Sequence, residues 1–306
     1  MIKIVSYNMP DMDGVSCMYA YSELLNKLGK KCAYIIDGKP KKEVEIVCDI
    51  FNIELDYSNK LKKDDKIILV DTNEINEISH NLNFDNIIEI IDHHHKSEKL
   101  NLMPNANFQI EKVGAAATLI AEKFKLYKIE ISLNAAILLY YGIISNTMNL
   151  HSNTTTERDE KMANWLSEKI NKPLEKITNQ IFKRKSLIDN SYLRNEMDME
   201  YRNENLNISW TMGQLEIADV MSFINKNRNK IFDIMNKIKI EKNIDFLSVN
   251  CIDIINEYTI ILPLDYETEK IIANTLKLKS KNEYFYINKI LTRKEIFEKI
   301  WHIYGK

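Results

Sequence analysis

Carboxylate and imidazole side chains follow three of the four clearest apolar, strand-like segments in the first half of the chain. Concentrating carboxylates at one place costs several kcal/mol unless a cation neutralises them. Hard carboxylate ligands with one or two imidazoles suit Mn²⁺ or Mg²⁺ better than zinc or copper. The residue types therefore predict a divalent-metal site, and the number of ligands predicts two ions. The residues concerned are Asp11, Asp13, Asp71, Asp92, His93, His94 and His95.

Each part of this pattern also has a purely structural interpretation. Asp11 and Asp13 could belong to a solvated acidic turn, and Asp71 could cap a following helix. Three successive histidines are harder to explain as part of a core, because a buried imidazole needs a hydrogen-bond partner. Half of the six histidines in the chain lie at 93–95. Taken together, the three groups favour metal binding.

A pair of divalent ions would give this chain a defined chemistry. Two ions about 4 Å apart can bridge and ionise a water molecule and stabilise an in-line attack on phosphorus. We therefore expect hydrolysis at phosphorus, with Mn²⁺ or Mg²⁺ as the cofactor.

The elements that must position these residues follow from the alternation of strand-like and helix-like segments. Repeated β-α units predict an α/β fold with a doubly wound, mainly parallel sheet and helices on both faces. In such a sheet, ligands bind beyond the carboxyl ends of the strands, where neighbouring loops converge. Strands are predicted at 2–7, 32–36, 66–70 and 87–91, and helices at 15–28, 41–51, 115–124, 133–145, 156–169 and 174–182.

A second unit follows a change in composition after residue 182, where charged residues and Asn dominate without a clear period. We place a linker near 183–192 and expect two domains, at 1–186 and at 187–306. The second is a smaller α/β domain. Its predicted strands are 208–212, 246–252 and 258–263, and its predicted helices are 216–240, 268–276 and a terminal segment around 293–302.

Composition excludes several other classes of function. The seven glycines are scattered, which excludes a dinucleotide fingerprint, a phosphate loop and a nucleophile elbow. The four cysteines form no C-x-x-C pair, and no apolar stretch reaches the about 20 residues that cross a bilayer. With no signal peptide, a cytoplasmic location without membrane contact is expected. A net charge of −2 argues against non-specific nucleic-acid binding, so a nucleic acid is expected only as a short oligonucleotide substrate.

Ordered motifs along nearly the whole chain resemble those of the DHH phosphoesterase superfamily. Within it, the chain is most similar to the family II, manganese-dependent inorganic pyrophosphatases. This resemblance implies a DHH domain at 1–186, a substrate-clamping domain at 187–306 and an active site in the cleft between them. The motifs are 10–13 (Pro-Asp-Met-Asp), 68–74, 91–94 (Ile-Asp-His-His), 113–118, 142–147 with 153–156, and 292–294 (Thr-Arg-Lys).

The resemblance also assigns metal ligands. Asp11 and Asp71 would hold the first ion, and Asp71 would bridge to the second. Asp13 and His93 would complete the protein side of the second ion. Asp92 would not bind an ion but would orient a histidine by a hydrogen bond, since metal-bound imidazoles usually donate their other N–H to a partner.

Other matched residues would contact the substrate. His94 would face the substrate or the leaving phosphate. Arg293 and Lys294 would clamp phosphate oxygens, and the guanidinium fork suits this role. His95 has no role in the family and is interpreted as a rim residue. A small phosphorylated molecule, pyrophosphate by default, is thus the expected substrate, and a homodimer stays open.

Three positions depart from the family pattern. Tyr7 stands where the family has a metal-binding His, and Asn146 stands where it has a metal-binding Asp. Glu200 takes the place of an expected substrate-binding Lys. Asn146 would still offer a carbonyl oxygen to the second ion, whereas a protonated Tyr is a poor ligand. These departures leave two alternatives open: a phosphodiesterase or exopolyphosphatase of the same superfamily, or a catalytically impaired regulatory protein that binds a phosphorylated ligand.

Overall fold

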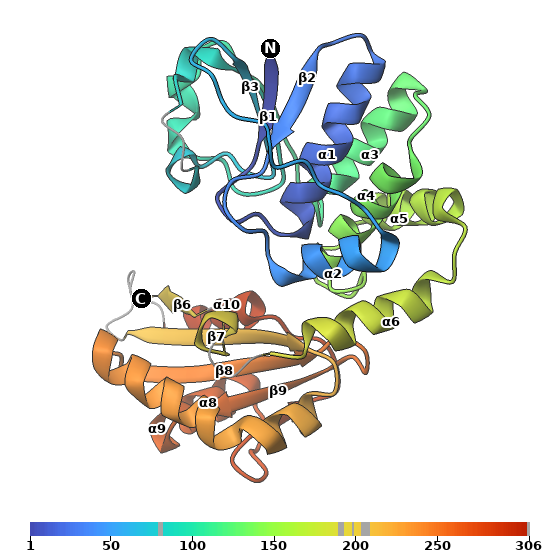
Figure 1. Ribbon diagram of the computed structural model, residues 1–306. Coiled ribbons are helices and arrows are strands. Elements are labelled where there is room, and N and C mark those ends of the chain that lie inside the picture. Colours follow the sequence, from blue (N-terminus) through green and yellow to red (C-terminus); the bar gives the residue numbers. More distant parts are fainter. Residues whose placement is uncertain (79–81, 189–192, 198, 203–208, 305–306) are drawn as a thin grey trace. The chain divides into compact units, whose positions relative to one another are not determined.

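The chain forms two compact units, Met1–Ile177 and Thr178–Lys306. The computed structural model describes residues 1–306 except 79–81, 189–192, 198, 203–208 and 305–306 (Figure 1). The division falls within helix α6 (Leu174–Lys185), which extends into the segment predicted as a linker. The predicted domain boundary after residue 186 lies just beyond this helix and stays a prediction.

The first unit contains a five-stranded sheet in the order β2-β1-β3-β4-β5, and all of its strand pairs are parallel. This confirms the predicted parallel α/β architecture. β5 has no counterpart in the sequence prediction, because it lies at an edge of the sheet and its side chains are exposed or half-buried. The strands are β1 (Ile2–Val5), β2 (Cys32–Ile35), β3 (Lys66–Val70), β4 (Ile87–Asp92) and β5 (Asn107–Ile110).

Helices were expected on both faces of this sheet, but among the described residues they cover one face (Figure 1), because the connections from β3 to β4 and from β4 to β5 form short 3₁₀ turns and loops in place of α-helices. α1 contacts β1, β2 and β3, and α3 contacts β4. The other face carries a cluster of buried strand residues that packs against short 3₁₀ turns and loops. The helices are α1 (Met12–Lys27), α2 (Lys42–Phe51), α3 (Ala116–Tyr127), α4 (Leu133–Asn146) and α5 (Glu157–Ile170); the 3₁₀ turns are η1 (Ile75–Glu77), η2 (Phe84–Asn86) and η3 (Glu98–Leu102).

Close packing of α1 on α4 sets the distance between two elements of the site. A Cβ atom on Gly142 of α4 would lie only 2.4 Å from the Ser16 Oγ atom of α1. Glycine is therefore the residue that permits this approach. The contact brings the start of α1, which carries Asp13, close to the end of α4, which carries Asn146.

The second unit contains another five-stranded sheet, in the order β10-β9-β8-β7-β6. Only β7 and β8 pair in parallel; the other pairs are antiparallel. Residue 208, the first of the predicted strand 208–212, lies outside the described residues. β6 and β10 were not predicted because each is only three residues long. The strands are β6 (Glu200–Arg202), β7 (Trp210–Ile217), β8 (Phe246–Asp253), β9 (Tyr258–Pro263) and β10 (Phe285–Ile287).

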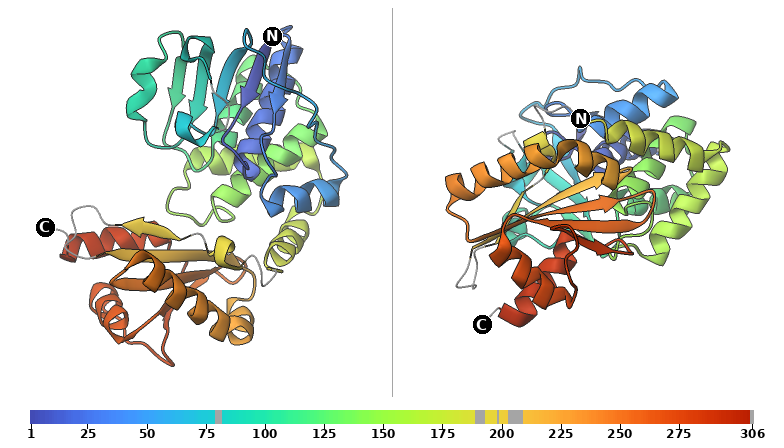
Figure 2. Two further views of the ribbon diagram at one scale, coloured as in Figure 1. Left: turned by 60° about the vertical axis from the view of Figure 1, so that its left-hand side comes forward. Right: turned by 90° about the horizontal axis from the view of Figure 1, so that it is seen from below.

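Helices cover both faces of this second sheet (Figure 2). α8 packs Ile231, Met235 and Ile238 into the cluster on one face. α9 and α10 pack on the other face. The helices are α7 (Leu193–Glu196), α8 (Val220–Lys242), α9 (Tyr266–Leu276) and α10 (Arg293–Tyr304). Among the described residues, no helix combines the length and apolarity needed to cross a membrane.

Candidate metal centre

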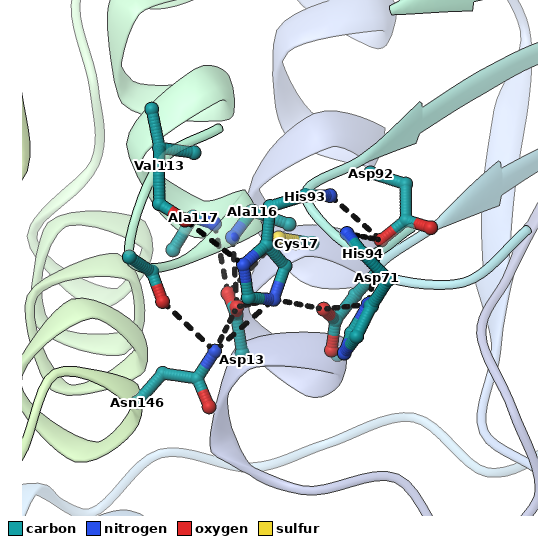
Figure 3. A network of polar contacts seen from close by, with 12 residues as sticks. Asp13, Cys17, Asp71, Asp92, His93, His94, Val113, Ala116, Ala117 and Asn146 are labelled. Atoms are coloured by element: carbon teal, nitrogen blue, oxygen red, sulfur yellow. Dashed lines mark hydrogen bonds and ion pairs between the residues drawn. The ribbon is translucent and has the colours of Figure 1, made fainter. Parts of the chain in front are cut away.

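Four of the predicted ligands, Asp13, Asp71, His93 and Asn146, lie together beyond the carboxyl ends of strands in the first sheet (Figure 3). β1, β3 and β4 are neighbours in the sheet, and each delivers part of the set from its carboxyl end. Asp11 caps α1 by accepting hydrogen bonds from the backbone N–H groups of Asp13 and Gly14 at 2.9 and 3.2 Å. Asp71 follows β3 directly, and Asp92 is the last residue of β4. The order of the strands therefore brings together loops whose residues are 21 to 81 positions apart in sequence.

His93 has one ring nitrogen in a hydrogen bond and one directed at carboxylates. Its Nδ1–H donates to the Val113 carbonyl oxygen at 3.0 Å, and in the neutral ring Nε2 then has a lone pair for a metal. The Nε2 atom lies 3.4 Å from Asp71 Oδ1 and 3.8 Å from Asp13 Oδ2. Two ligand atoms that each lie about 2.1 Å from the same ion are separated from one another by a distance close to these values. The His93 tautomer and position thus fit a metal ligand.

Asp71 is the group in this centre that most needs a cation. Its side chain is only 2% exposed, and its Oδ1 atom has no hydrogen-bond partner among the described residues. Burial, together with the charges of Asp13 and Asp11, raises its pKa well above the ordinary value. Its backbone lies in the left-handed region with φ at 56°, which is costly for a residue other than glycine and is typical of functional sites.

Asp13 is equally buried but has hydrogen-bond donors on both oxygens. The backbone N–H groups of Ala116 and Ala117, at the start of α3, donate to Oδ2 and Oδ1 at 2.8 and 2.7 Å. The helix N-terminus also favours a negative charge. Burial and the charge of Asp11 nevertheless raise its pKa to about 6, while His93 acts in the opposite direction.

Asp92 holds the histidines rather than facing the open part of the centre. Its Oδ1 atom accepts from the backbone N–H of His93 at 2.7 Å and from His94 Nδ1 at 2.8 Å, while Asn73 Nδ2 donates to its Oδ2. Burial opposes ionisation, but the hydrogen bonds from His94 and Asn73 outweigh it and lower the pKa of Asp92. Burial alone would lower the pKa of His94, but Asp92 and Asp71 raise it.

The four side chains Asp71, Asp92, His93 and His94 bring potential ligand atoms within 4.8 Å of one another. Because both oxygens of Asp92 already accept hydrogen bonds, we assign it a positioning role within this group. The side chain of His95 is exposed, and its carbonyl oxygen accepts a hydrogen bond from Asn73 at 3.0 Å. The remaining donor set, with the unpaired Asp71 oxygen and the His93 Nε2, fits a divalent cation.

Tyr7 and Asn146 do not present ligand oxygens in this structure. The Tyr7 hydroxyl accepts from the Asp11 backbone N–H at 3.2 Å, and burial with the charges of Asp11 and Asp71 raises its pKa far above the ordinary range. It therefore stays a neutral phenol beside the centre. Asn146 directs Nδ2, not its carbonyl oxygen, at Asp13 Oδ2 and His93 Nε2, at 3.1 and 3.2 Å. The carbonyl ligand expected from the sequence is thus replaced by an amide donor, because the neighbours of this amide are all acceptors.

Arg293 and Lys294 lie in the second unit, at the start of α10. The Arg293 backbone N–H donates to Gln214 Oε1 at 2.8 Å, and Thr292 and Glu295 cap the helix by mutual hydrogen bonds. This fixes the backbone that carries both cations. Their predicted role toward phosphate stays a prediction.

Two supporting residues were missed by the analysis of the sequence. Asn73 is 1% exposed; it donates to Asp92 and accepts from the Ser97 backbone N–H at 2.6 Å. Asp159 is fully buried and holds the segment that carries Val113. The available signal for Asp159 was the Thr156-x-x-Asp159 capping pattern at the start of α5. Asn73 lies in a motif but had no assigned role.

Comparisons with known proteins agree with this architecture. Residues 1–143 match the sequence profile of the DHH family, N-terminal domain. A manganese-dependent inorganic pyrophosphatase from Methanothrix thermoacetophila is 28% identical over 297 residues, which cover 96% of this chain and 95% of the relative.

Two solved structures share the fold. A Methanococcus jannaschii protein, provisionally assigned as a family II inorganic pyrophosphatase, is similar over the full length of both chains, with a TM-score of 0.70 and 24% identity. An exopolyphosphatase-related protein from Bacteroides fragilis matches 99% of this chain and 92% of its own length, with a TM-score of 0.50 and 15% identity. At these identities the likeness concerns the fold alone.

Proposed function

We propose that the protein is a divalent-metal-dependent phosphohydrolase that hydrolyses pyrophosphate or a related phosphoanhydride; the match of residues 1–143 to the profile of the DHH family, N-terminal domain, supports this. The observation that carries this proposal is the buried Asp71 Oδ1 atom, which has no hydrogen-bond donor among the described residues and lies 3.4 Å from the His93 Nε2 atom. A buried carboxylate oxygen without a donor is unfavourable in the absence of a cation. Manganese is the metal named for the relative from Methanothrix thermoacetophila.

The residues of the candidate centre would have separate roles in metal binding and proton transfer. Asp71 and His93 hold the cation, and Asp11 adds a second carboxylate from the start of α1. When bound, a divalent cation lowers the pKa of a water molecule and polarises a phosphoryl oxygen. His94, held by its hydrogen bond to Asp92 at 2.8 Å and with its pKa raised, can donate a proton to a leaving phosphate.

Binding of the substrate requires positive charge, which the metal centre does not supply from its own side chains. We assign this role to Arg293 and Lys294 at the start of α10, since guanidinium and ammonium groups bind phosphate oxygens. The division of labour then places the metal ligands in the first unit and the phosphate clamp in the second. A homodimer and a cytoplasmic location stay predictions.

A direct test is phosphate release by the purified full-length chain. Pyrophosphate, tripolyphosphate and a short dinucleotide are each incubated with Mn²⁺, Mg²⁺ or Co²⁺, with a chelator as the negative control. We expect metal-dependent phosphate release from pyrophosphate and its loss in Asp71→Asn. Turnover of tripolyphosphate or the dinucleotide in its place would favour the exopolyphosphatase or phosphodiesterase alternative.

A regulatory protein that binds a phosphorylated ligand is the second candidate. It is favoured by Tyr7 and Asn146, neither of which presents a ligand oxygen to the centre. Absence of turnover with every metal, together with tight binding of pyrophosphate in calorimetry, would establish this candidate and reject the enzyme.

A further inference from the structure

The Asn146 side chain occupies a position among three acceptors from different parts of the first unit (Figure 3). Its Nδ2 atom lies 3.1 Å from Asp13 Oδ2, 3.2 Å from His93 Nε2 and 3.1 Å from the Gly114 carbonyl oxygen. Asp13 comes from α1, His93 follows β4, and Gly114 precedes α3. Acceptor atoms that converge in this way usually coordinate a cation.

These neighbours determine which end of the amide faces inward. A carboxylate oxygen and a carbonyl oxygen can only accept, and in the neutral tautomer of His93 whose Nδ1–H donates to Val113, Nε2 accepts as well. If Oδ1 of Asn146 faced them, four lone-pair groups would meet without a hydrogen. The amide therefore supplies two N–H hydrogens at a place where acceptors would otherwise need a cation.

The hydrogens of Asn146 are sufficient for two of the three acceptors. Asp13 also accepts from Ala116 and Ala117, so each of its two oxygens has a backbone N–H donor besides the Asn146 amide. If Asp13 and Gly114 take the two hydrogens, the lone pair of His93 Nε2 stays available toward Asp71. The centre thus has two halves. In the filled half, the Asn146 amide lies among Asp13, His93 and Gly114. In the open half, Asp71 Oδ1 has no hydrogen-bond donor among the described residues.

We propose that the Asn146 amide takes the place of a second cation, so that this centre binds one divalent ion, at Asp71 and His93. The inference rests on the proposed metal-dependent function and revises the two ions that the number of ligands predicts. The filled half then serves to fix Asp13 and the start of α3 without a metal. A carboxylate at position 146 would repel Asp13 and would restore the need for a second cation.

The test is the number of Mn²⁺ ions bound by the metal-free, full-length chain, measured by titration calorimetry without substrate. We expect one ion for the natural chain and two for Asn146→Asp. The matched control is Asn164→Asp, which adds the same charge at an exposed position of α5 and should still bind one ion. Electron paramagnetic resonance adds an independent readout, because neighbouring Mn²⁺ ions couple magnetically and a single ion does not.

The outcomes separate this inference from the proposed function. Two ions bound by the natural chain would overturn the inference but leave a metal-dependent hydrolase intact. No bound ion would overturn both. One ion in a folded Asn146→Asp chain, checked by circular dichroism, would show that the amide does not exclude the second ion. If that variant does not fold, the stoichiometry and spectrum of the natural chain decide alone.

Discussion

Two buried aspartates of the centre illustrate how hydrogen bonding decides the state of a carboxylate. Asp92 and Asp71 are 0% and 2% exposed, yet the pKa of Asp92 is lowered and that of Asp71 is raised. Asp92 accepts from His93, His94 and Asn73, whereas Asp71 Oδ1 has no donor among the described residues. Donors to the ionised form favour it, and burial without donors disfavours it.

The first prediction concerns Asp71→Asn. Its raised pKa means that the folded, metal-free chain retains a proton that the unfolded chain releases above about pH 4. The free energy of unfolding of the metal-free chain should therefore fall as the pH rises from about 4 toward the pKa of Asp71 in the folded chain. Replacing Asp71 by the uncharged Asn should remove the part of this decrease that comes from Asp71, leaving the part from the raised pKa of Asp13. It should stabilise the metal-free chain at pH 7 by about 1–3 kcal/mol.

Thermal unfolding with a chelator and with Mn²⁺ measures both halves of this prediction. The natural chain should gain stability from Mn²⁺, since a ligand that binds only the folded state stabilises it. Asp71→Asn should gain none. An equal Mn²⁺-induced rise in the melting temperatures of both chains would contradict the assignment of Asp71 as a ligand.

The second prediction concerns Asp92→Asn. Since Asp92 helps to raise the pKa of His94, removing its charge should lower that pKa. Nuclear magnetic resonance titration of the metal-free protein measures the shift, and His94→Gln identifies the resonance. In the loaded enzyme, the same change should reduce turnover by roughly 10–100-fold, as is usual for groups that orient a site histidine. An unchanged His94 titration would show that Asp92 has no influence on it.

At the scale of elements, the segment before α3 connects the site to the helical layer. It carries the Val113 carbonyl that accepts from His93, and the α3 N-terminus that donates to Asp13. Asp159 of α5 holds this segment: its oxygens accept from the Gly114 backbone N–H at 2.8 Å and the Thr118 hydroxyl at 2.5 Å. A helix without a metal ligand thus positions the metal centre.

The third prediction follows from this arrangement. Asp159→Ala leaves the Gly114 N–H and the Thr118 and Thr156 hydroxyls without their acceptor, and should lower the free energy of unfolding by about 2–4 kcal/mol. It should also weaken Mn²⁺ binding, because Val113 then orients His93 less firmly. Urea unfolding and Mn²⁺ titration measure the two effects. Glu160→Ala, at the exposed neighbouring position, should change stability by no more than about 0.5 kcal/mol.

At the scale of the whole molecule, the proposed chemistry is divided between two units with separate sheets and cores. The predicted metal ligands all lie in the first unit, and the predicted phosphate-binding cations lie in the second. Metal binding and substrate binding should therefore respond separately to substitution.

The fourth prediction tests this separation. Arg293→Ala should lower kcat/KM for pyrophosphate by roughly 100-fold, because it removes a charge-assisted contact to phosphate. Its Mn²⁺ affinity should equal that of the natural chain. Lys299→Ala, an exposed position on the same helix, is the matched control and should leave both quantities unchanged. A loss of Mn²⁺ affinity in Arg293→Ala would refute the separation of the two roles.

The strands that carry the site were predictable because their signal is local. Apolar β-branched runs at β1, β3 and β4, each followed by acidic residues, sufficed to place Asp11, Asp71 and Asp92 at one sheet edge. Edge strand β5 was missed, since a strand with exposed side chains has no apolar run to reveal it.

The character of each ligand depended on neighbours that are distant along the chain. The raised pKa of Asp71 and the lowered pKa of Asp92 come from burial and donors supplied by other loops. The sequence does not indicate whether the oxygen or the nitrogen of the Asn146 amide faces the centre. The acceptor atoms of Asp13, His93 and Gly114, which lie around it in the folded chain, decide for the nitrogen. Hydrophobic periodicity is a property of a segment, whereas hydrogen-bond direction and charge state are properties of a folded neighbourhood.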